Sequence, residues 1–187
     1  MATFTKIPAD TFESLQTDAG VLLKTFNPQE YTAEGIESAI ICATTGGIQA
    51  SCVPTFSDMG EDVDNCPNNM LELKHLDSWE CKLAFTALST NRDVIKLALG
   101  AADESGGKIT PRRDLKDTDF ADIWWVGDLA NGGAVAVKLI NALSTSGYSL
   151  QTTKNGKGQI SVELLGHVSI DEQDVMPMEF YVLAPKT

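Results

Sequence analysis

The chain lacks the long apolar runs that a membrane protein needs. No segment approaches the ~20 consecutive apolar residues of a membrane-spanning helix. Its first residues, 1–6, have neither the basic n-region nor the apolar h-region of a secretion signal. With 187 residues, 43% of them hydrophobic, and no segment that resembles a linker, the sequence predicts one soluble domain spanning 1–187 that stays in the cytoplasm where it is made.

Cysteine is also scarce, and its spacing excludes the common metal and redox motifs. Cys42, Cys52, Cys66 and Cys81 contain no Cys-x-x-Cys pattern. A reducing compartment favours buried free thiols over disulfides. Because Cys42 and Cys52 flank a Gly46-Gly47 turn signal, a disulfide between these two stays open as an alternative.

Basic side chains are few, with 14 Lys and Arg against 26 Asp and Glu and a formal net charge of -12. General binding to nucleic acid depends on Lys and Arg that neutralise phosphates, so the composition argues against it. The same acidity would suit a channel wall that DNA passes without sticking, since repulsion acts within about 8 Å at physiological salt. Acidity also simply confers solubility, and the charge alone leaves both readings open.

Catalytic motifs are missing. The two histidines, His75 and His167, lie beside apolar strand residues without partners at the spacing of a metal centre or a nucleophile system. Gly107-Lys108 lacks the rest of a phosphate-binding loop, the 156–158 segment does not complete a dinucleotide-binding fingerprint, and no Gly-x-Ser-x-Gly occurs. We therefore predict no enzyme activity, no cofactor, and no catalytic, cofactor-binding or metal-binding residues.

One acidic cluster has the donor chemistry of a calcium site. It comprises Asp58, Glu61, Asp62 and Asp64, between Pro54 and Pro67. Calcium takes six to eight oxygen ligands, but the spacing departs from the known Asp-x-Asp-x-Asp-Gly loop. We interpret the cluster as a solvated acidic loop, and residues 171–174 as a turn. A calcium-dependent binding module remains an alternative function.

Alternating apolar segments separated by turn residues predict a mainly β fold. Gly46-Gly47 and Asn155-Gly156 each predict a hairpin turn. Pro54 is expected to end the strand that follows the first of these turns. Alternation in 79–88 places Trp79, Cys81, Leu83 and Phe85 on a buried face. The predicted strands are 20–26, 38–44, 48–53, 70–76, 79–88, 122–128, 134–143, 148–153, 159–165 and 178–183, with a short one near 108–111. Residues 134–143 are apolar almost throughout, so a helix stays open there as an alternative, although their β-branched residues favour a strand.

One helix is predicted over 91–99. Thr90 and Asp93 form a relative of the capping box at its start, Gly100 ends it, and Val94 and Leu97 with a neighbour form an apolar stripe. A single short helix should cover an open end or edge of the sheet. The expected architecture is a closed or nearly closed β-sandwich or barrel with one flanking helix and long loops at about 54–69 and 101–121.

Trp124 and Trp125 are adjacent in a predicted strand, so only one can enter the core. The other is a candidate anchor for a subunit contact, because exposed aromatic anchors dominate interface energy. Alternatively, a loop or the helix of the same chain covers it.

Several segments occur in a characteristic order and spacing, without a chemical motif among them. They are 12–20 with 26–28, 43–48, 62–65 with 70–74, the tryptophan pair in 123–128, and 166–170. In this order and spacing, over nearly the whole chain, the sequence resembles the major tail tube protein family of long-tailed, non-contractile bacteriophages.

The resemblance implies a structural virion protein of the tail. Family members form sixfold rings that stack into a hollow tube, with a β-barrel core, a flanking helix and a long loop that reaches the next ring. Implied partners are other copies of the chain, the tape measure protein, and distal tail and tail terminator proteins, while DNA passes through the lumen without specific binding and no membrane is involved. The loops at 54–69 and 101–121 are candidates for the contact between rings. A tube protein of a contractile tail or a secretion system, on the same fold, remains an alternative.

Overall fold

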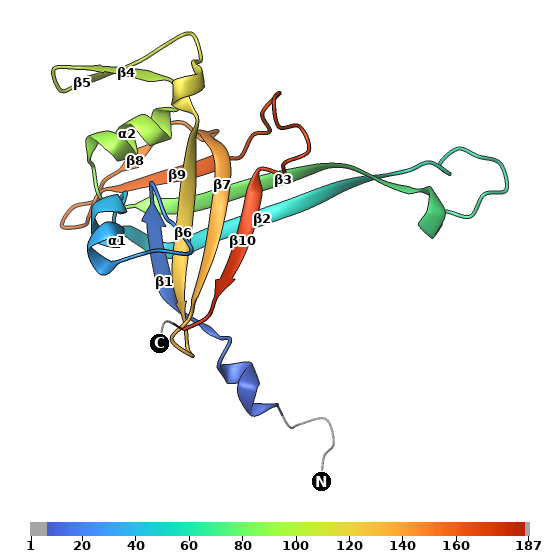
Figure 1. Ribbon diagram of the computed structural model, residues 1–187. Helices are drawn as coiled ribbons and strands as arrows, with labels where there is room; N and C mark the ends of the chain where they lie inside the picture. The colour runs from blue at the N-terminus through green and yellow to red at the C-terminus, as the bar shows by residue number, and fades with distance from the viewer. Residues whose placement is uncertain (1–6, 186–187) are drawn as a thin grey trace.

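The computed structural model describes residues 7–185 and is dominated by antiparallel strands (Figure 1). The prediction about a secretion signal in 1–6 lies outside the described residues. The strands are β1 Gln16–Leu23, β2 Thr44–Asp58, β3 Lys74–Ala87, β4 Ala102–Ser105, β5 Lys108–Pro111, β6 Ala121–Leu129, β7 Ala134–Ser144, β8 Leu150–Gln151, β9 Gln159–Leu165 and β10 Met178–Leu183. The helices are α1 Ala33–Ala39 and α2 Arg92–Leu99, with 3-10 turns at Ala9–Phe12, Leu71–Leu73 and Asp117–Asp119.

The main sheet runs in the order β1-β6-β7-β9-β3-β2, with β10 beside β7 and β8 beside β9. The segment that leads into β2 joins the two ends of this sheet. Ile41 N donates to Leu22 O at 2.9 Å on the β1 side, and Leu88 N donates to Ala43 O at 2.8 Å on the β3 side. The sheet therefore curls into a nearly closed barrel, which confirms the predicted mainly β class.

The barrel interior holds the main hydrophobic core, and α2 packs against it at one end (Figure 1). Strand β7 faces two apolar layers, because Val137 and Leu139 belong to the interior while Ala136 packs on the other side with Trp124. A strand buried on both faces needs apolar residues throughout, as its sequence has. The strand predicted at 134–143 is confirmed.

Helix α2 forms as its sequence predicts, except that Asn91 and not Thr90 is the N-cap. The Asn91 side chain accepts a hydrogen bond from Val94 N at 2.8 Å, and Gly100 ends the helix with φ at 72°. Val94 and Ala98 are buried, and Leu97 packs partly against the core.

The prediction of a single flanking helix is wrong, because α1 occupies part of the predicted strand 38–44. Thr32 caps α1 by accepting a hydrogen bond from Gly35 N at 3.1 Å. The helix covers the outer face of β1 and β6, where Ile36 and Ala39 pack near Trp124. An apolar surface outside the barrel thus becomes a second, smaller core.

The predicted hairpin at Gly46-Gly47 is also wrong, since both glycines lie inside β2. Their φ values of 76° and 81° belong to a bulge, where the register with β3 shifts between Thr45 and Ile48. Pro54 does not end the strand: it pairs opposite Trp79 and lacks only an N–H that an edge strand can spare.

These changes shorten the first predicted loop. Residues 54–58 belong to β2, so the connection runs from Met59 to the turn Leu71–Leu73, and the strands predicted at 70–76 and 79–88 merge into β3. The second predicted loop, 101–121, contains the β4–β5 hairpin, in which the strand predicted near 108–111 is confirmed. The hairpin around Asn155 is confirmed too, because β8 pairs with β9.

Candidate assembly surfaces

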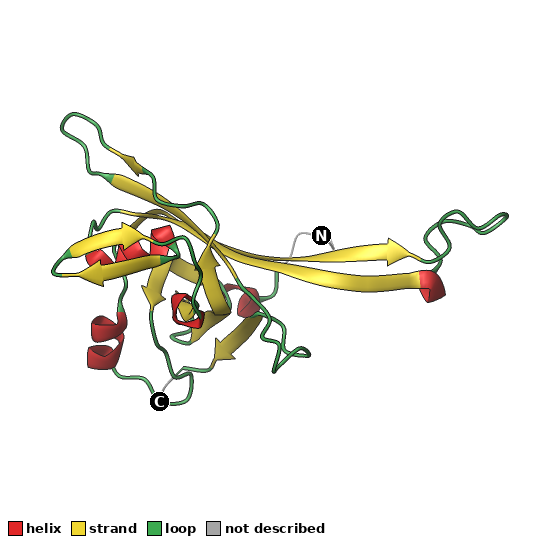
Figure 2. Ribbon diagram, turned by 90° about the horizontal axis from the view of Figure 1, so that it is seen from above, coloured by secondary structure: helices red, strands yellow, loops and turns green. Residues whose placement is uncertain are grey.

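A long two-stranded arm projects from the barrel. Strand β9 pairs with β3 only from Lys82 to Ala87, so the outer parts of the β2–β3 hairpin, residues 52–58 and 74–81, pair with each other, and only Cys81 O bonds elsewhere in the described backbone pairing, to Gly166 N. We call these residues, with the connection between them, the arm. Seven residues of β2 at about 3.4 Å each give a length of about 24 Å. Figures 1 and 2 show the arm reaching well beyond the rest of the molecule.

The arm has one apolar face and one polar face. Pro54 pairs with Trp79, and Phe56 pairs with Leu76, on the side that continues the core face of Cys81. Phe56 is 52%, Leu76 42% and Trp79 37% exposed. Trp79 was predicted to be buried; it points to the predicted side, but the core ends before the strand does. A two-stranded ribbon with an apolar face is only marginally stable alone, so this face is suited to a partner.

On the opposite face the side chains around Thr55 and Ser57 are polar, whereas Val53, nearer the barrel, is apolar and 56% exposed. Thr55 pairs with Ser78, and Ser57 Oγ donates to Asp77 Oδ1 at 2.9 Å. A register shift between Thr55 and Phe56 keeps the apolar side chains together on one side. The arm is therefore amphipathic in its middle part, around Phe56.

The acidic cluster lies at the tip of the arm, where Asp58 serves the backbone. Its carboxylate accepts hydrogen bonds from Gly60 N at 2.9 Å and Asn69 N at 2.8 Å, and these bonds lower the pKa of Asp58. Glu61, Asp62 and Asp64 are exposed, as expected of a solvated acidic loop. Within residues 7–185, no three His, Cys, Asp or Glu side chains gather in a way that could hold a metal ion.

A second apolar surface lies on β10. This strand pairs with β7, and over the described part of the chain its other edge meets no strand. Phe180 and Val182 are 62% and 80% exposed, although Phe180 pairs with the buried Val137. We call Phe180 and Val182 the β10 patch.

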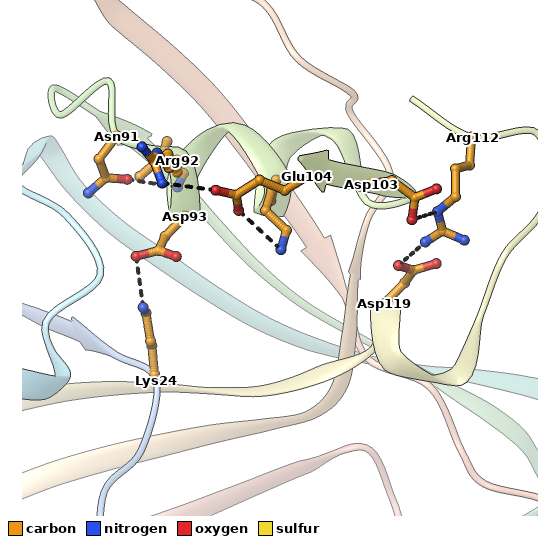
Figure 3. A network of polar contacts seen from close by, with 10 residues as sticks. Lys24, Asn91, Arg92, Asp93, Asp103, Glu104, Arg112 and Asp119 are labelled. Carbon is orange, nitrogen blue, oxygen red and sulfur yellow. Dashed lines mark hydrogen bonds and ion pairs between the residues drawn. The ribbon is translucent and has the colours of Figure 1, made fainter. Parts of the chain in front are cut away.

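A network of ion pairs fastens the β4–β5 hairpin to the barrel (Figure 3). Glu104 of β4 lies 3.1 Å from Arg92 Nη1 and 3.7 Å from Lys96 Nζ of α2. Arg112 Nε lies 2.9 Å from Asp103, and its Nη2 contacts Asp119. These contacts explain why the predicted loop 101–121 has a defined structure.

The Arg112–Asp119 pair is the buried part of this network, with both side chains less than a tenth exposed. The pKa of Asp119 is lowered, first by the hydrogen bond from Lys116 N at 2.9 Å and then by the Arg112 guanidinium. The carboxylate therefore stays charged in the folded state at neutral pH.

Trp124 is buried and Trp125 is partly buried within the chain, as in the alternative that the same chain covers the pair, so neither is a fully exposed anchor. Trp124 packs with Phe26 and Tyr181 at ring distances of 5.5 Å on the outer face. Trp125 packs against the interior core, and its Nε1 donates to Ala19 O at 3.0 Å. Phe56 and Phe180 are exposed apolar side chains that the sequence patterns do not identify as candidate contacts.

The histidines do not form a site. His75 is exposed on the arm, whereas His167 is half-buried, with Nδ1 3.1 Å from Asn141 O and its ring edge-on to Phe120. The four cysteines all lie in described positions and are free thiols, two of them buried. Cys52 faces Cys81 across the strands, and not Cys42.

Comparison with known proteins adds little. No protein-family model matches the chain, and no curated protein matches it. Among solved structures, it is similar to a chain from the virion of a native gene transfer agent particle, with a TM-score of 0.43 and 10% identity over 87% of this chain and 95% of that chain. This similarity is too distant to carry an argument. Over residues 7–185 no helix is long and apolar enough to cross a bilayer.

Proposed function

We propose that this chain is a structural virion protein of a phage tail, a subunit of hexameric rings that stack into the tail tube and conduct DNA during ejection. The single observation that carries the proposal is the arm, whose apolar face has no cover from the described residues of the same chain. The whole-chain resemblance to tail tube proteins of non-contractile phages supports it independently of the fold.

A stacked tube needs two kinds of contact. Head-to-tail contacts around an axis close a ring, and a second contact joins the top of one ring to the bottom of the next. The arm and the β4–β5 hairpin project from different parts of the barrel (Figure 1), and they include the segments expected to make the contact between rings. The free edge of β10 and its apolar patch suit a contact within the ring, because an unpaired edge strand can accept a strand from a neighbour.

The tube would be a passive conduit. Assembly on a tape measure protein sets its length, with distal tail proteins at one end and a terminator at the other. The net charge of -12 favours lumen walls that repel DNA phosphates. Exchanging lumen-facing Asp or Glu for Lys should slow genome ejection, and unchanged ejection would count against this role for the charge.

Negative-stain electron microscopy of the purified protein, across concentration and time, tests the proposal. Hollow tubes or stacked rings of uniform width are expected, if necessary only after the tape measure and tail-tip proteins are added to nucleate them. A monomer that persists with those proteins present would overturn the proposal.

Two alternatives have different outcomes in simple assays. A tube protein of a contractile tail or a secretion system would form similar tubes, but would co-purify with a sheath or with secretion components. A calcium-dependent binding module would show a saturable, stoichiometric heat on titration with calcium. The Asp58 carboxylate already accepts hydrogen bonds from the Gly60 and Asn69 backbone N–H groups, which argues against its serving as a calcium ligand.

A further inference from the structure

Two cysteines lie directly opposite each other where the arm leaves the barrel. Cys52 of β2 and Cys81 of β3 are register partners, so their side chains lie on the same face of the ribbon. Cys81 is fully buried in the core, and Cys52 is half-buried and packs against the same cluster.

The backbone hydrogen bonds show which type of antiparallel pair this is. The N–H and C=O of one strand residue point toward the same neighbouring strand. Cys81 O accepts a hydrogen bond from Gly166 N at 3.0 Å, on the side of β9, so the backbone of Cys81 faces away from β2. Backbone groups along a strand alternate between the two neighbouring strands, so an even-numbered residue of β3 should face β2 if Cys81 faces β9. Leu88 N does donate to Ala43 O, on the β2 side.

Cys52 and Cys81 therefore occupy a non-hydrogen-bonded pair. In such pairs the Cα atoms are about 4.5 Å apart and the side chains are closest. That separation lies within the Cα distances of about 4.4–6.8 Å that disulfides span. The two thiols can thus be joined with little movement of the backbone.

We propose that Cys52 and Cys81 form a dithiol modification site, which a small-molecule disulfide such as oxidised glutathione converts into a cross-strand disulfide. The Cys52 thiolate attacks one sulfur of the oxidant, forms a mixed disulfide and releases one reduced glutathione. The Cys81 thiolate then attacks the Cys52 sulfur, closes the protein disulfide and releases a second reduced glutathione. Two protein thiols are oxidised, one glutathione disulfide is reduced, and the two thiol protons go to the released glutathione.

The order of the two steps follows from exposure. Cys52 is the partly accessible thiol, whereas burial, and then contact with the Cys52 thiol, raises the pKa of Cys81 to about 12. The second step is therefore slow near neutral pH. Its rate should rise with pH, because burial alone keeps the pKa of Cys81 raised and only the Cys81 thiolate attacks the mixed disulfide.

The position of the pair decides what the disulfide would do. Lys82 is the last residue of β3 that pairs with β9, so Cys52 and Cys81 hold the first rung of the arm. A covalent bond there would close residues 53–80 into a loop and restrain the base of the arm relative to the barrel. We expect slower amide hydrogen exchange after oxidation at Val53 and Thr55 and in residues 78–80, all of which carry a backbone N–H. This inference does not depend on the proposed function.

Disulfide mapping tests the inference on the full chain. The reduced protein is incubated with oxidised glutathione at pH 8, its remaining thiols are alkylated, and peptides from a non-reducing digest are identified by mass spectrometry. The expected product is a peptide pair joined through Cys52 and Cys81, lighter by two hydrogen atoms than the reduced pair. The C66S variant is the matched control, since Cys66 lies in the connection at the tip of the arm, and it should give the same yield.

Mapping of the wild-type chain is sufficient to overturn the inference. Stable glutathione on Cys52 with Cys81 still free, even after prolonged incubation at pH 9, would do so, as would a disulfide that joins Cys42 to Cys52. The C52S variant should leave Cys81 unmodified until the protein is unfolded. If C52S fails to fold by circular dichroism, C52A provides the same comparison.

Discussion

Replacement of Phe56 by alanine tests whether the apolar face of the arm is a contact between subunits. Phe56 lies in the outer part of β2, pairs with Leu76, and is 52% exposed in the single chain. Because the side chain contributes little to the core, the variant should keep the fold. We expect the substitution to weaken the association of subunits and to leave the stability of the monomer nearly unchanged.

The magnitude follows from the exposed area. A buried aromatic side chain removes about 150–250 Å² from water, so the exposed half of Phe56 offers about 100 Å² to a partner. At about 25 cal/mol per Å² this area is worth about 2.5 kcal/mol if a neighbouring subunit covers it fully. A free energy of that size corresponds to a change of about 60-fold in the association constant. Within the monomer, loss of the cross-strand pair with Leu76 should cost less than about 1 kcal/mol.

The assay measures the lowest subunit concentration at which tubes elongate, by sedimentation and negative-stain microscopy. We expect this threshold to rise by up to about 60-fold in F56A. Thr55→Ala is the matched control, because Thr55 is exposed on the same strand but on the polar face of the arm. Urea unfolding of both variants establishes that the monomers remain equally stable.

An unchanged threshold in F56A would refute the reasoning about the apolar face. An equal rise in F56A and T55A would point to a general effect on the arm and not to a contact through one face. Reduced monomer stability in F56A, by more than about 1 kcal/mol, would show that Phe56 belongs to the core of its own chain.

Three further predictions concern the folded chain. Gly20 and Gly147 both have φ at 69°, but a Cβ at Gly20 would clash with Trp125 and Val126, whereas a Cβ at Gly147 would have no atom within 4 Å. In urea unfolding we expect G147A to lower the free energy of unfolding by about 1–2 kcal/mol and G20A to lower it by about 1–3 kcal/mol more. Equal losses in the two variants would contradict the steric argument. The lowered pKa of Asp119 means that its stabilising effect is complete above the unfolded pKa of about 4 and is lost as the pH falls through the folded pKa. Urea midpoints of the wild type should therefore fall more steeply below pH ~4 than those of D119N, and parallel curves would rule out this contribution. Replacement of the N-cap Asn91 by alanine should destabilise the protein by about 1 kcal/mol in thermal or urea unfolding, and no loss would mean that the cap is redundant.

Local signals explain the successful predictions. Helix α2 depends on a cap, an apolar stripe and a terminal glycine that all lie within ten residues of one another. The apolar run of β7 predicts a strand buried on both faces, because such a strand has no polar side to show. Asn155 and Gly156 lie in a turn whose requirement for positive φ is also local.

The failures concern residues whose local preference suits more than one structure. Positive φ at Gly46 and Gly47 serves a bulge as well as a turn, and only the pairing with β3 selects the bulge. Pro54 is tolerated because β2 lies at the edge of the sheet, which is a property of strand order. The alternation of Pro54, Thr55 and Phe56 does continue the strand period, and it is the signal by which the arm could have been found.

The sequence by itself determined the mainly β class, the long apolar strand, the capped helix and the absence of recognisable catalytic motifs, since each depends on residues close together in the chain. Only the tertiary structure decided that β2 and β3 outrun the barrel, that Phe56 and Phe180 are exposed while Trp124 is buried and Trp125 is partly buried, and that Cys52 faces Cys81. The physical reason is that exposure and register depend on which strands pair and where that pairing stops, and a hydrophobic pattern shows the face of a strand but not whether another layer covers it.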